Sequence, residues 1–232
     1  VADVGRFEAA LRAKREAGRK ILVPYLTGGL GDDWLETVHA VAHAGADGIE
    51  IGIPFSDPVM DGPTIQEAND RALSAGVTPH SILTAIRDTA LDIPLAVMTY
   101  YNIAFRAGDT RFANDLADAG ISAAILPDLP LEETHSWAAA ADAAGIETIL
   151  LAAPTAPEER LPRICARSRG FVYGVGLLGI TVVREERAKS AREIDGRLKG
   201  ENDMTLRVGV GVGTPQQAVE VSAVADGVVV GS

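Results

Sequence analysis

Three of the five acidic residues in the segment GIEIGIPFSDPVMDGPTIQEAND (48–70) lie close together before its helical part. Glu50 is inside an aliphatic run typical of a buried strand, and Asp57 and Asp61 follow in a loop rich in Pro and Gly. Burying a carboxylate is costly unless it is paired or protonated. Two carboxyl groups in different environments, one apolar with a raised pKa and one wetter and ionised, can divide the acid and base steps of a reaction. In the structural alternative, Glu50 pairs with a buried Arg or Lys and the aspartates cap the next helix. The residues alone leave both interpretations open.

Glycine-rich ends follow three other aliphatic runs: GVGLLGIT (174–181), VGVGVGTP (208–215) and VVVGS (228–232). Glycine lets backbone N–H groups come close to an anion, and loops after the last two strands of a barrel often bind phosphate. Tight packing of strand against loop is the structural alternative. The run GVGVG lacks the third glycine and the later acidic residue of a dinucleotide fingerprint. We therefore predict a phosphate site rather than a dinucleotide site.

Eight aliphatic runs alternate with Ala-rich amphipathic segments. The runs cover 21–27, 48–53, 94–101, 123–128, 147–153, 171–176, 206–212 and 227–232. The helices are expected at 3–17, 33–44, 64–74, 79–90, 109–119, 132–144, 157–168, 188–200 and 215–225. Such alternation indicates right-handed βαβ units and a parallel sheet. A doubly wound open sheet is the alternative, but the count of eight favours a (β/α)₈ TIM barrel.

The helix ends carry their own signals. Glycines at AGAD (44–47), AGI (119–121) and AGI (144–146) suit helix C-termini. Thr78-Pro79 and Thr214-Pro215 suit helix N-termini. We expect one domain over 1–232, with an extra N-terminal helix. The chain stops after the eighth strand, so we expect the closing C-terminal helix to be absent, through truncation or disorder.

The composition excludes several classes of protein. The formal net charge is −11, which argues against broad binding to nucleic acid or to an anionic membrane. No apolar run is long enough to span a bilayer, and the start is not a signal peptide. A single cysteine, Cys165, excludes a disulfide scaffold and is compatible with a reducing cytosol. We therefore expect a cytoplasmic globular protein.

Lysine and histidine placement argues against two other chemistries. A Schiff-base aldolase needs a lysine near a strand end inside the barrel mouth. The four lysines lie before or at the first strand or around the sixth helix: Lys14, Lys20, Lys189 and Lys199. His39 and His43 are four residues apart on a helix outside the barrel, without the glutamate of a zinc protease motif. We predict no metal, and Cys165 is expected to pack as a small apolar residue.

Taken together, these motifs resemble the alpha chain family of tryptophan synthase over essentially the whole length. The most specific part is AGADGIEIGIPFSDPVMDGPTIQEAN (44–69). Supporting parts are RFEAALRAKREAGRKILVPYLTGG (6–29), YYNIAFRAG (100–108), ILPDLPLEE (125–133), VGVGVGTPQQ (208–217) and ADGVVVGS (225–232). The resemblance implies a barrel that cleaves indole-3-glycerol phosphate into indole and glyceraldehyde 3-phosphate. It implies no cofactor in this chain, with pyridoxal phosphate in a beta-chain partner of an α₂β₂ complex.

The resemblance also implies roles for particular residues. It makes Glu50 and Asp61 catalytic. The residues expected around the substrate are Tyr25, Met98, Tyr100, Tyr173, Thr181 and Val210. The residues expected near the phosphate are Val182, Gly211, Gly231 and Ser232. The loop that faces the partner consists of Pro54, Phe55, Ser56, Asp57 and Pro58.

One departure from the family concerns the loop after the sixth strand. Members typically have Gly-Val-Thr-Gly there, in a loop that closes over the substrate, and this chain has Gly179-Ile180-Thr181-Val182. Valine does not readily adopt positive φ, and its branched side chain hinders a close phosphate contact. Two alternatives therefore stay open beside a working alpha subunit. One is a stand-alone lyase that releases free indole, and the other is a low-activity subunit that mainly activates a beta chain. A phosphate-binding barrel isomerase is disfavoured by segment 44–69.

Overall fold

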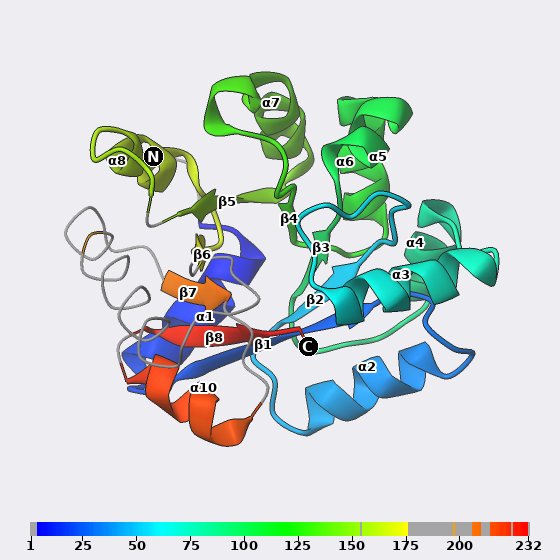
Figure 1. Ribbon diagram of the computed structural model, residues 1–232, viewed down its shortest axis with the longest axis horizontal. Helices are drawn as coiled ribbons and strands as arrows, with labels where there is room; N and C mark the ends of the chain where they lie inside the picture. Colours follow the sequence, from blue (N-terminus) through cyan, green and yellow to red (C-terminus); the bar gives the residue numbers. More distant parts are fainter. Residues whose placement is uncertain are drawn as a thin grey trace.

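Eight parallel strands form a closed barrel in the computed structural model, and helices surround it (Figure 1). The structure describes residues 4–153, 155–175, 197, 206–209, 214–223 and 225–231. Each strand pairs with the next in sequence, and β8 closes the barrel on β1. The strands are β1 (Ile21–Thr27), β2 (Ile49–Gly52), β3 (Leu95–Met98), β4 (Ala123–Ile125), β5 (Glu147–Ala152), β6 (Val172–Val175), β7 (Leu206–Gly209) and β8 (Gly227–Val230). The predicted barrel is confirmed, and the open sheet is excluded.

The helices follow the strands around the outside of the barrel. In the described part they are α1 (Arg6–Glu16), α2 (Trp34–His43), α3 (Pro63–Ser74), α4 (Pro79–Arg87), α5 (Tyr101–Ala107), α6 (Asp109–Asp118), the 3₁₀ turn η1 (Leu131–Glu133), α7 (His135–Ala144), α8 (Arg160–Arg167) and α10 (Pro215–Ser222). Among the described helices, none has the length and apolar content that crossing a bilayer requires.

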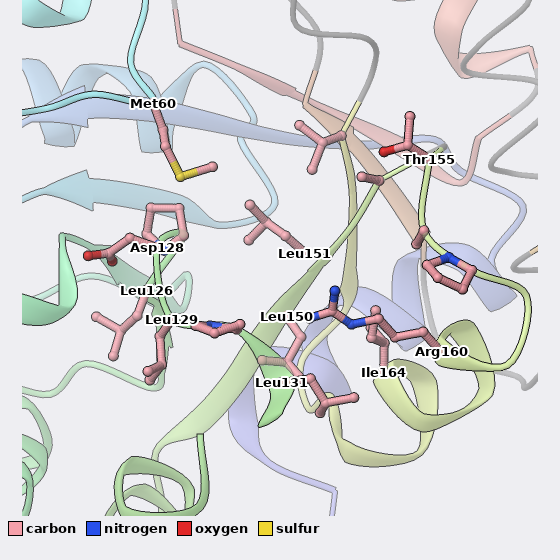
Figure 2. A pocket seen from close by; sticks show the side chains of 16 residues that line it. Met60, Leu126, Asp128, Leu129, Leu131, Leu150, Leu151, Thr155, Arg160 and Ile164 are labelled. Atoms are coloured by element: carbon pink, nitrogen blue, oxygen red, sulfur yellow. The ribbon is translucent and has the colours of Figure 1, made fainter. Parts of the chain in front are cut away.

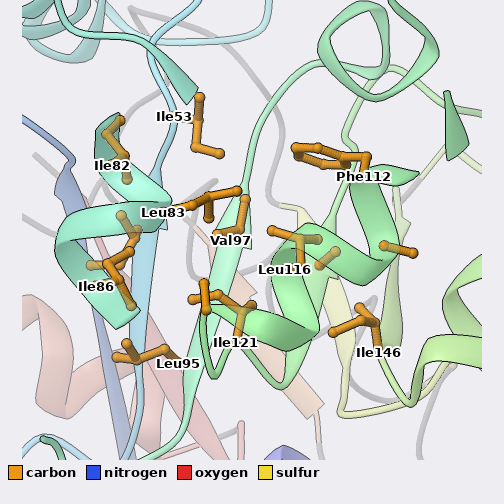
Figure 3. Packing of buried hydrophobic residues seen from close by; sticks show 14 of the residues in the cluster. Ile53, Ile82, Leu83, Ile86, Leu95, Val97, Phe112, Leu116, Ile121 and Ile146 are labelled. Carbon is orange, nitrogen blue, oxygen red and sulfur yellow. The ribbon is translucent and has the colours of Figure 1, made fainter. Parts of the chain in front are cut away.

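Side chains that alternate along the strands build two cores. Residues that point outward pack against the helices, as Val97 of β3 does between Leu83 of α4 and Leu116 of α6 (Figure 3). Residues that point inward fill the barrel axis together with Phe7 and Leu11 of α1. This inner core consists of Phe7, Leu11, Ile21, Val23, Ala96, Ala123, Ile125, Ile149, Phe171 and Val229. The strand residues in these cores are thus covered on both faces of the sheet, which explains the largely continuous aliphatic runs, and Leu22 of β1 is an exception at 38% exposed.

Helix α1 closes the end of the barrel at which the strands begin. The ring of Phe7 lies 6.0 Å from the ring of Phe171, measured between centroids. The first turn of α1 has no capping side chain of its own. Instead, the Glu147 carboxylate at the start of β5 accepts the backbone N–H groups of Phe7 at 2.7 Å and Glu8 at 2.9 Å. A helix cap therefore comes from a strand about 140 residues away in the sequence.

The predicted helix signals are confirmed where the structure describes them. Gly45, Gly120 and Gly145 follow their helices with positive φ. The side chain of Thr78 accepts the backbone N–H of Ser81 at the start of α4. Thr214 accepts the N–H of Gln217 at the start of α10 in the same way.

The third predicted strand is wrong at its end. β3 stops at Met98, and a helix that the sequence did not predict, α5, begins at Tyr101. The reason is a contact from another element: the Asp128 carboxylate accepts the backbone N–H of Tyr101 at 2.8 Å, at the first residue of this helix. Aromatic residues favour strands in sequence patterns, so TYY (99–101) extended the apparent strand. The helix predicted at 188–200 lies, apart from residue 197, outside the described residues.

Candidate active site

Glu50 lies inside the barrel, completely buried. It is the second residue of β2, where every residue is buried. Its register partners are Tyr25 on β1 and Ala96 on β3. Because register partners in a parallel sheet face the same side, and Ala96 belongs to the inner core, the Glu50 side chain points into the barrel. A carboxylate is thereby placed among apolar and aromatic side chains, as the sequence predicted.

Asp61 is held over the carboxyl end of the same barrel by Tyr100. The Tyr100 hydroxyl donates to Asp61 Oδ2 at 3.2 Å and accepts the backbone N–H of Met60 at 2.8 Å. The ring of Phe55 stacks on the ring of Tyr100, with 5.1 Å between centroids. A buried tyrosine that follows β3 therefore fixes the loop that follows β2 at both of its ends.

Burial raises the pKa of Asp61, and the hydrogen bond from Tyr100 lowers it in part. Burial also raises the pKa of Tyr25, Tyr100 and Tyr173 above the ordinary tyrosine value, so all three hydroxyls keep their protons at neutral pH. Electrostatic interactions with both Glu50 and Asp61 contribute to the raised pKa values of Tyr25 and Tyr173. The two carboxyls and three tyrosines are thus one electrostatic cluster.

Known proteins resemble the chain in sequence and in fold. Residues 11–232 match the family model described as tryptophan synthase alpha chain. The chain belongs to the tryptophan synthase alpha chain family. The alpha chain of Thermobifida fusca is 45% identical over 226 residues, which covers 95% of this chain and 83% of the relative. The alpha chain of Halorhodospira halophila is 41% identical, and the match covers 99% of this chain and 86% of the relative.

Two solved structures show the same fold. A tryptophan synthase structure from Mycobacterium tuberculosis superposes with a TM-score of 0.92 at 38% identity, covering 99% of this chain and 89% of that one. The alpha subunit of Legionella pneumophila superposes with a TM-score of 0.89 at 31% identity, and the match covers 99% of this chain and 87% of that one. Membership in the family makes the chain a carbon–carbon lyase of tryptophan biosynthesis, which cleaves indole-3-glycerol phosphate to indole and glyceraldehyde 3-phosphate. The family needs no cofactor in this subunit, and pyridoxal phosphate belongs to the beta chain.

The structure brings most of the predicted substrate residues together and leaves others undescribed. Tyr25, Met98 and Tyr173 are on inward positions of β1, β3 and β6, in or next to the layer of Glu50. Gly231 follows β8 beside the Tyr25 ring. The other predicted residues lie outside the described residues: Thr181, Val182, Val210, Gly211 and Ser232.

The partner loop of the prediction is the first half of the β2–α3 connection. Pro54 is buried and Phe55 is partly covered by its stacking on Tyr100. Ser56 and Asp57 are exposed, and the Ser56 hydroxyl donates to the Asp57 carboxylate at 2.6 Å. Asp57 therefore points away from the barrel interior, and Asp61 is the loop carboxylate that joins the cluster around Glu50.

Three side chains of this end of the barrel were not identified from the sequence. Thr27 ends β1 and makes a hydrogen bond to the Tyr25 hydroxyl. The Thr99 hydroxyl donates to the backbone oxygen of Ile53 at 3.1 Å and so ties the end of β3 to the end of β2. Asn69 on α3 is 2% exposed, and within the described part no partner is seen for its Oδ1. A polar residue at the end of an aliphatic run was the available signal for both threonines.

A cavity of about 710 Å³ lies beside this cluster. It runs between the ends of β4 and β5 and helix α8, with Met60 on one side and Arg160 and Ile164 on the other (Figure 2). Neither Glu50 nor Asp61 lines it. The cavity adjoins the β2–α3 loop through Met60, whereas Glu50 lies inside the barrel and Asp61 over its carboxyl end.

No group of His, Cys, Asp and Glu within the described ranges is arranged to hold a metal ion. The ring of His43 is hydrogen-bonded to the backbone oxygen of His39 at 2.9 Å, which fits the structural interpretation of this pair. Cys165 is 3% exposed and packs in an apolar cluster with Leu161 and Val172, as predicted.

Proposed function

We propose that Glu50 and Asp61 carry out the cleavage of indole-3-glycerol phosphate. Carbon C3 of the indole ring takes up a proton, which gives an indoleninium cation with its positive charge at nitrogen. The glycerol hydroxyl next to C3 then loses its proton, the carbon–carbon bond breaks, and its electron pair returns to the ring. Glyceraldehyde 3-phosphate and indole result, and the proton balance is zero. One group that alternates between acid and base is sufficient for both transfers.

Glu50 suits the proton transfers because it is buried on the inner wall of the barrel. Asp61 suits the indole N–H, where a carboxylate orients the ring and stabilises positive charge on the indolenine. This division of roles rests on one observation: Tyr100 holds Asp61 over the mouth of the barrel, and Glu50 lies inside the same barrel. Tyr25, Met98, Tyr100 and Tyr173 would then enclose the ring.

The test is the isosteric substitution Glu50→Gln, assayed by indole release. We expect loss of cleavage with an unchanged circular dichroism spectrum and an unfolding transition close to that of the wild type. A folded Glu50→Gln enzyme that keeps most of its activity would make Glu50 a structural residue. The conservative control is Glu158→Gln, which changes an exposed carboxylate outside the barrel.

We also propose that the phosphate of the substrate binds at the ends of β7 and β8. Gly231 supports the assignment, because it follows β8 at the end of the barrel that carries Asp61. Val182, Gly211 and Ser232 complete the proposed site from the family pattern. A crystal soaked with inorganic phosphate checks the assignment, and phosphate bound elsewhere with this site empty would contradict it.

We propose a beta-chain partner in an α₂β₂ complex in the cytoplasm. Two large apolar side chains stay exposed in the segments that follow β2 and β3: Val59 is 81% exposed and Phe105 is 66% exposed. Together with the exposed Ser56 and Asp57 of the loop Pro54 to Pro58, they mark the proposed surface for the beta chain. Indole release measured with and without a beta chain tests the complex. Equal rates of indole release with and without the beta chain would favour a stand-alone lyase. A negligible rate in both assays, together with activation of the beta chain, would favour a low-activity subunit.

A further inference from the structure

The side chain of Tyr25 lies in a slot formed by two glycines on the neighbouring strands. A Cβ at Gly52 of β2 would lie 1.9 Å from the Tyr25 hydroxyl oxygen and 2.4 Å from its Cζ. A Cβ at Gly231, after β8, would lie 3.5 Å from the Tyr25 Cβ. The ring therefore extends across β2, and its hydroxyl occupies the space that a side chain at position 52 would take.

Strand register places this hydroxyl directly above Glu50. Tyr25 pairs with Glu50, and Thr27 pairs with Gly52, one inward position closer to the mouth of the barrel. Because the hydroxyl fills the Cβ position of Gly52, it lies in the Thr27–Gly52 layer. Glu50 is in the layer below it, and the loop that carries Asp61 is above it. The Tyr25 hydroxyl is thus on the mouth side of Glu50, toward the loop that carries Asp61.

The Thr27 side chain is a hydrogen-bond partner of the Tyr25 hydroxyl, and this bond lowers the pKa of the phenol in part. Burial keeps the phenol protonated. A phenol hydroxyl has one proton to donate and can also accept, and the carboxyl groups that interact electrostatically with the Tyr25 hydroxyl are those of Asp61 and Glu50. Asp61 already accepts from Tyr100.

We propose that Tyr25 is a positioning residue for the cleavage, whose hydroxyl donates to the Glu50 carboxylate and holds it ionised and directed toward the substrate. The inference rests on the proposed function of Glu50. A hydrogen bond to a carboxylate favours its ionised form. Glu50 must be ionised when it takes the proton from the glycerol hydroxyl. The ring of Tyr25 forms part of the wall around the substrate, and its hydroxyl positions Glu50.

Other titratable groups face the same space from neighbouring elements. Tyr173 of β6 and Asp61 of the β2–α3 loop interact electrostatically with Tyr25, and so does Tyr100 after β3. The substitution Tyr25→Phe leaves each of these residues in place, so the effect of the Tyr25 hydroxyl can be measured by itself.

The experiment compares Tyr25→Phe with Tyr101→Phe in the full chain. Tyr101 also directs its hydroxyl at a carboxylate, Asp109 Oδ2 at 3.4 Å, but on helices outside the barrel. For Tyr25→Phe we expect kcat to fall about ten- to a hundredfold, which is typical for a lost hydrogen bond to a charged group, with KM within about twofold. The acid limb of the pH profile of kcat/KM should move to higher pH. Tyr101→Phe should change neither.

A second variant, Gly52→Ala, displaces the hydroxyl but leaves the phenol present. We expect the same shift of the acid limb, with the unfolding transition recorded to show that the variant is folded. Repeating Tyr25→Phe in an enzyme that also carries Asp61→Asn distinguishes Glu50 from Asp61. If the Tyr25 hydroxyl acts through Glu50, the shift of the acid limb persists in this double variant. Its disappearance there would assign the hydroxyl to Asp61 and overturn the inference.

Three results distinguish the inference from the function on which it rests. A folded Glu50→Gln enzyme with normal activity overturns both. An inactive Glu50→Gln enzyme together with an unchanged kcat and pH profile in Tyr25→Phe overturns the inference alone. A raised KM with unchanged kcat in Tyr25→Phe would also overturn it, because the residue would then only bind the substrate.

Discussion

The Tyr100 hydroxyl donates a hydrogen bond to the Asp61 carboxylate at 3.2 Å, across the gap between the segments that follow β3 and β2. The same hydroxyl accepts from the backbone of Met60, so a single side chain sets both the position of Asp61 and the path of its loop. Burial works against the ionised form of Asp61 by raising its pKa, and Tyr100 works in its favour. The proposed role of Asp61 as an anion beside the indole nitrogen therefore depends on Tyr100.

Tyr100→Phe tests this dependence. Loss of the donor should raise the pKa of Asp61 further, so that activity falls at a higher pH on the acid side and kcat/KM drops by roughly tenfold near neutral pH. The measurement is the pH profile of indole release for both enzymes. Phenylalanine retains the stacking on Phe55, so the unfolding transition should move little. A profile identical to that of the wild type would show that the hydroxyl serves only the loop backbone.

Asp61→Asn tests the carboxylate itself. Asparagine keeps the size and one acceptor oxygen but cannot stabilise positive charge as an anion, so we expect a loss of about 10²- to 10⁴-fold in kcat. Steady-state assays of indole release check this, and Asp57→Asn in the exposed first half of the loop is the control. A loss of tenfold or less would reduce Asp61 to a binding residue.

The barrel and its two carboxylates could be predicted from the sequence because both depend on local patterns. Aliphatic runs at regular spacing indicate strands covered on both faces, and Glu50 is conspicuous in such a run. Helix α5 could not be predicted in this way, because the Asp128 carboxylate that caps it follows the next strand. Local propensity contains no information about a cap that comes from another element.

The hydrogen bonds around Glu50 and Asp61 also depend on contacts between elements that are far apart in the sequence. Tyr25 was expected as part of an apolar wall, and its hydroxyl gains significance only through the register of β1 on β2 and the space above Gly52. Tyr100 was also expected at the substrate, but its bond to Asp61 joins residues 39 positions apart. The presence of Tyr25 and Tyr100 near the two carboxylates could thus be predicted from the sequence, and their hydrogen bonds could not.

Gly5→Ala should destabilise the fold, because the Glu147 carboxylate lies against Gly5. A Cβ there would be 2.3 Å from the Glu147 Cδ, so the carboxylate would have to leave the two N–H groups that it caps. We expect a loss of about 1–3 kcal/mol and a Tm lower by roughly 2–10 °C, measured by thermal unfolding. Gly62→Ala is the matched control: Gly62 also precedes a helix with an extended backbone, and its Cβ position is open. Equal effects of the two substitutions would show that the contact with Glu147 is unimportant.

The pH dependence of stability should report the charge of Glu147. Burial raises its pKa to about 7, with Glu8 as a further cause, although the N–H groups of Phe7 and Glu8 favour the ionised form. Between about pH 4.5 and 7 the folded state then keeps a proton that the unfolded state has lost. The contribution of Glu147 to the free energy of unfolding is thus complete below about pH 4.5. It falls as the pH rises to 7, by up to about 3 kcal/mol.

Glu147→Gln isolates this contribution, because glutamine resembles the protonated acid and does not titrate. Urea unfolding of the wild type and the variant at pH 5 and pH 7.5 gives four free energies. We expect the wild-type free energy relative to that of Glu147→Gln to decrease from pH 5 to pH 7.5, since only the wild type loses the proton from its buried carboxyl. A relative free energy that increases over this interval would mean that the N–H groups of α1 outweigh burial and that Glu147 caps the helix as an anion.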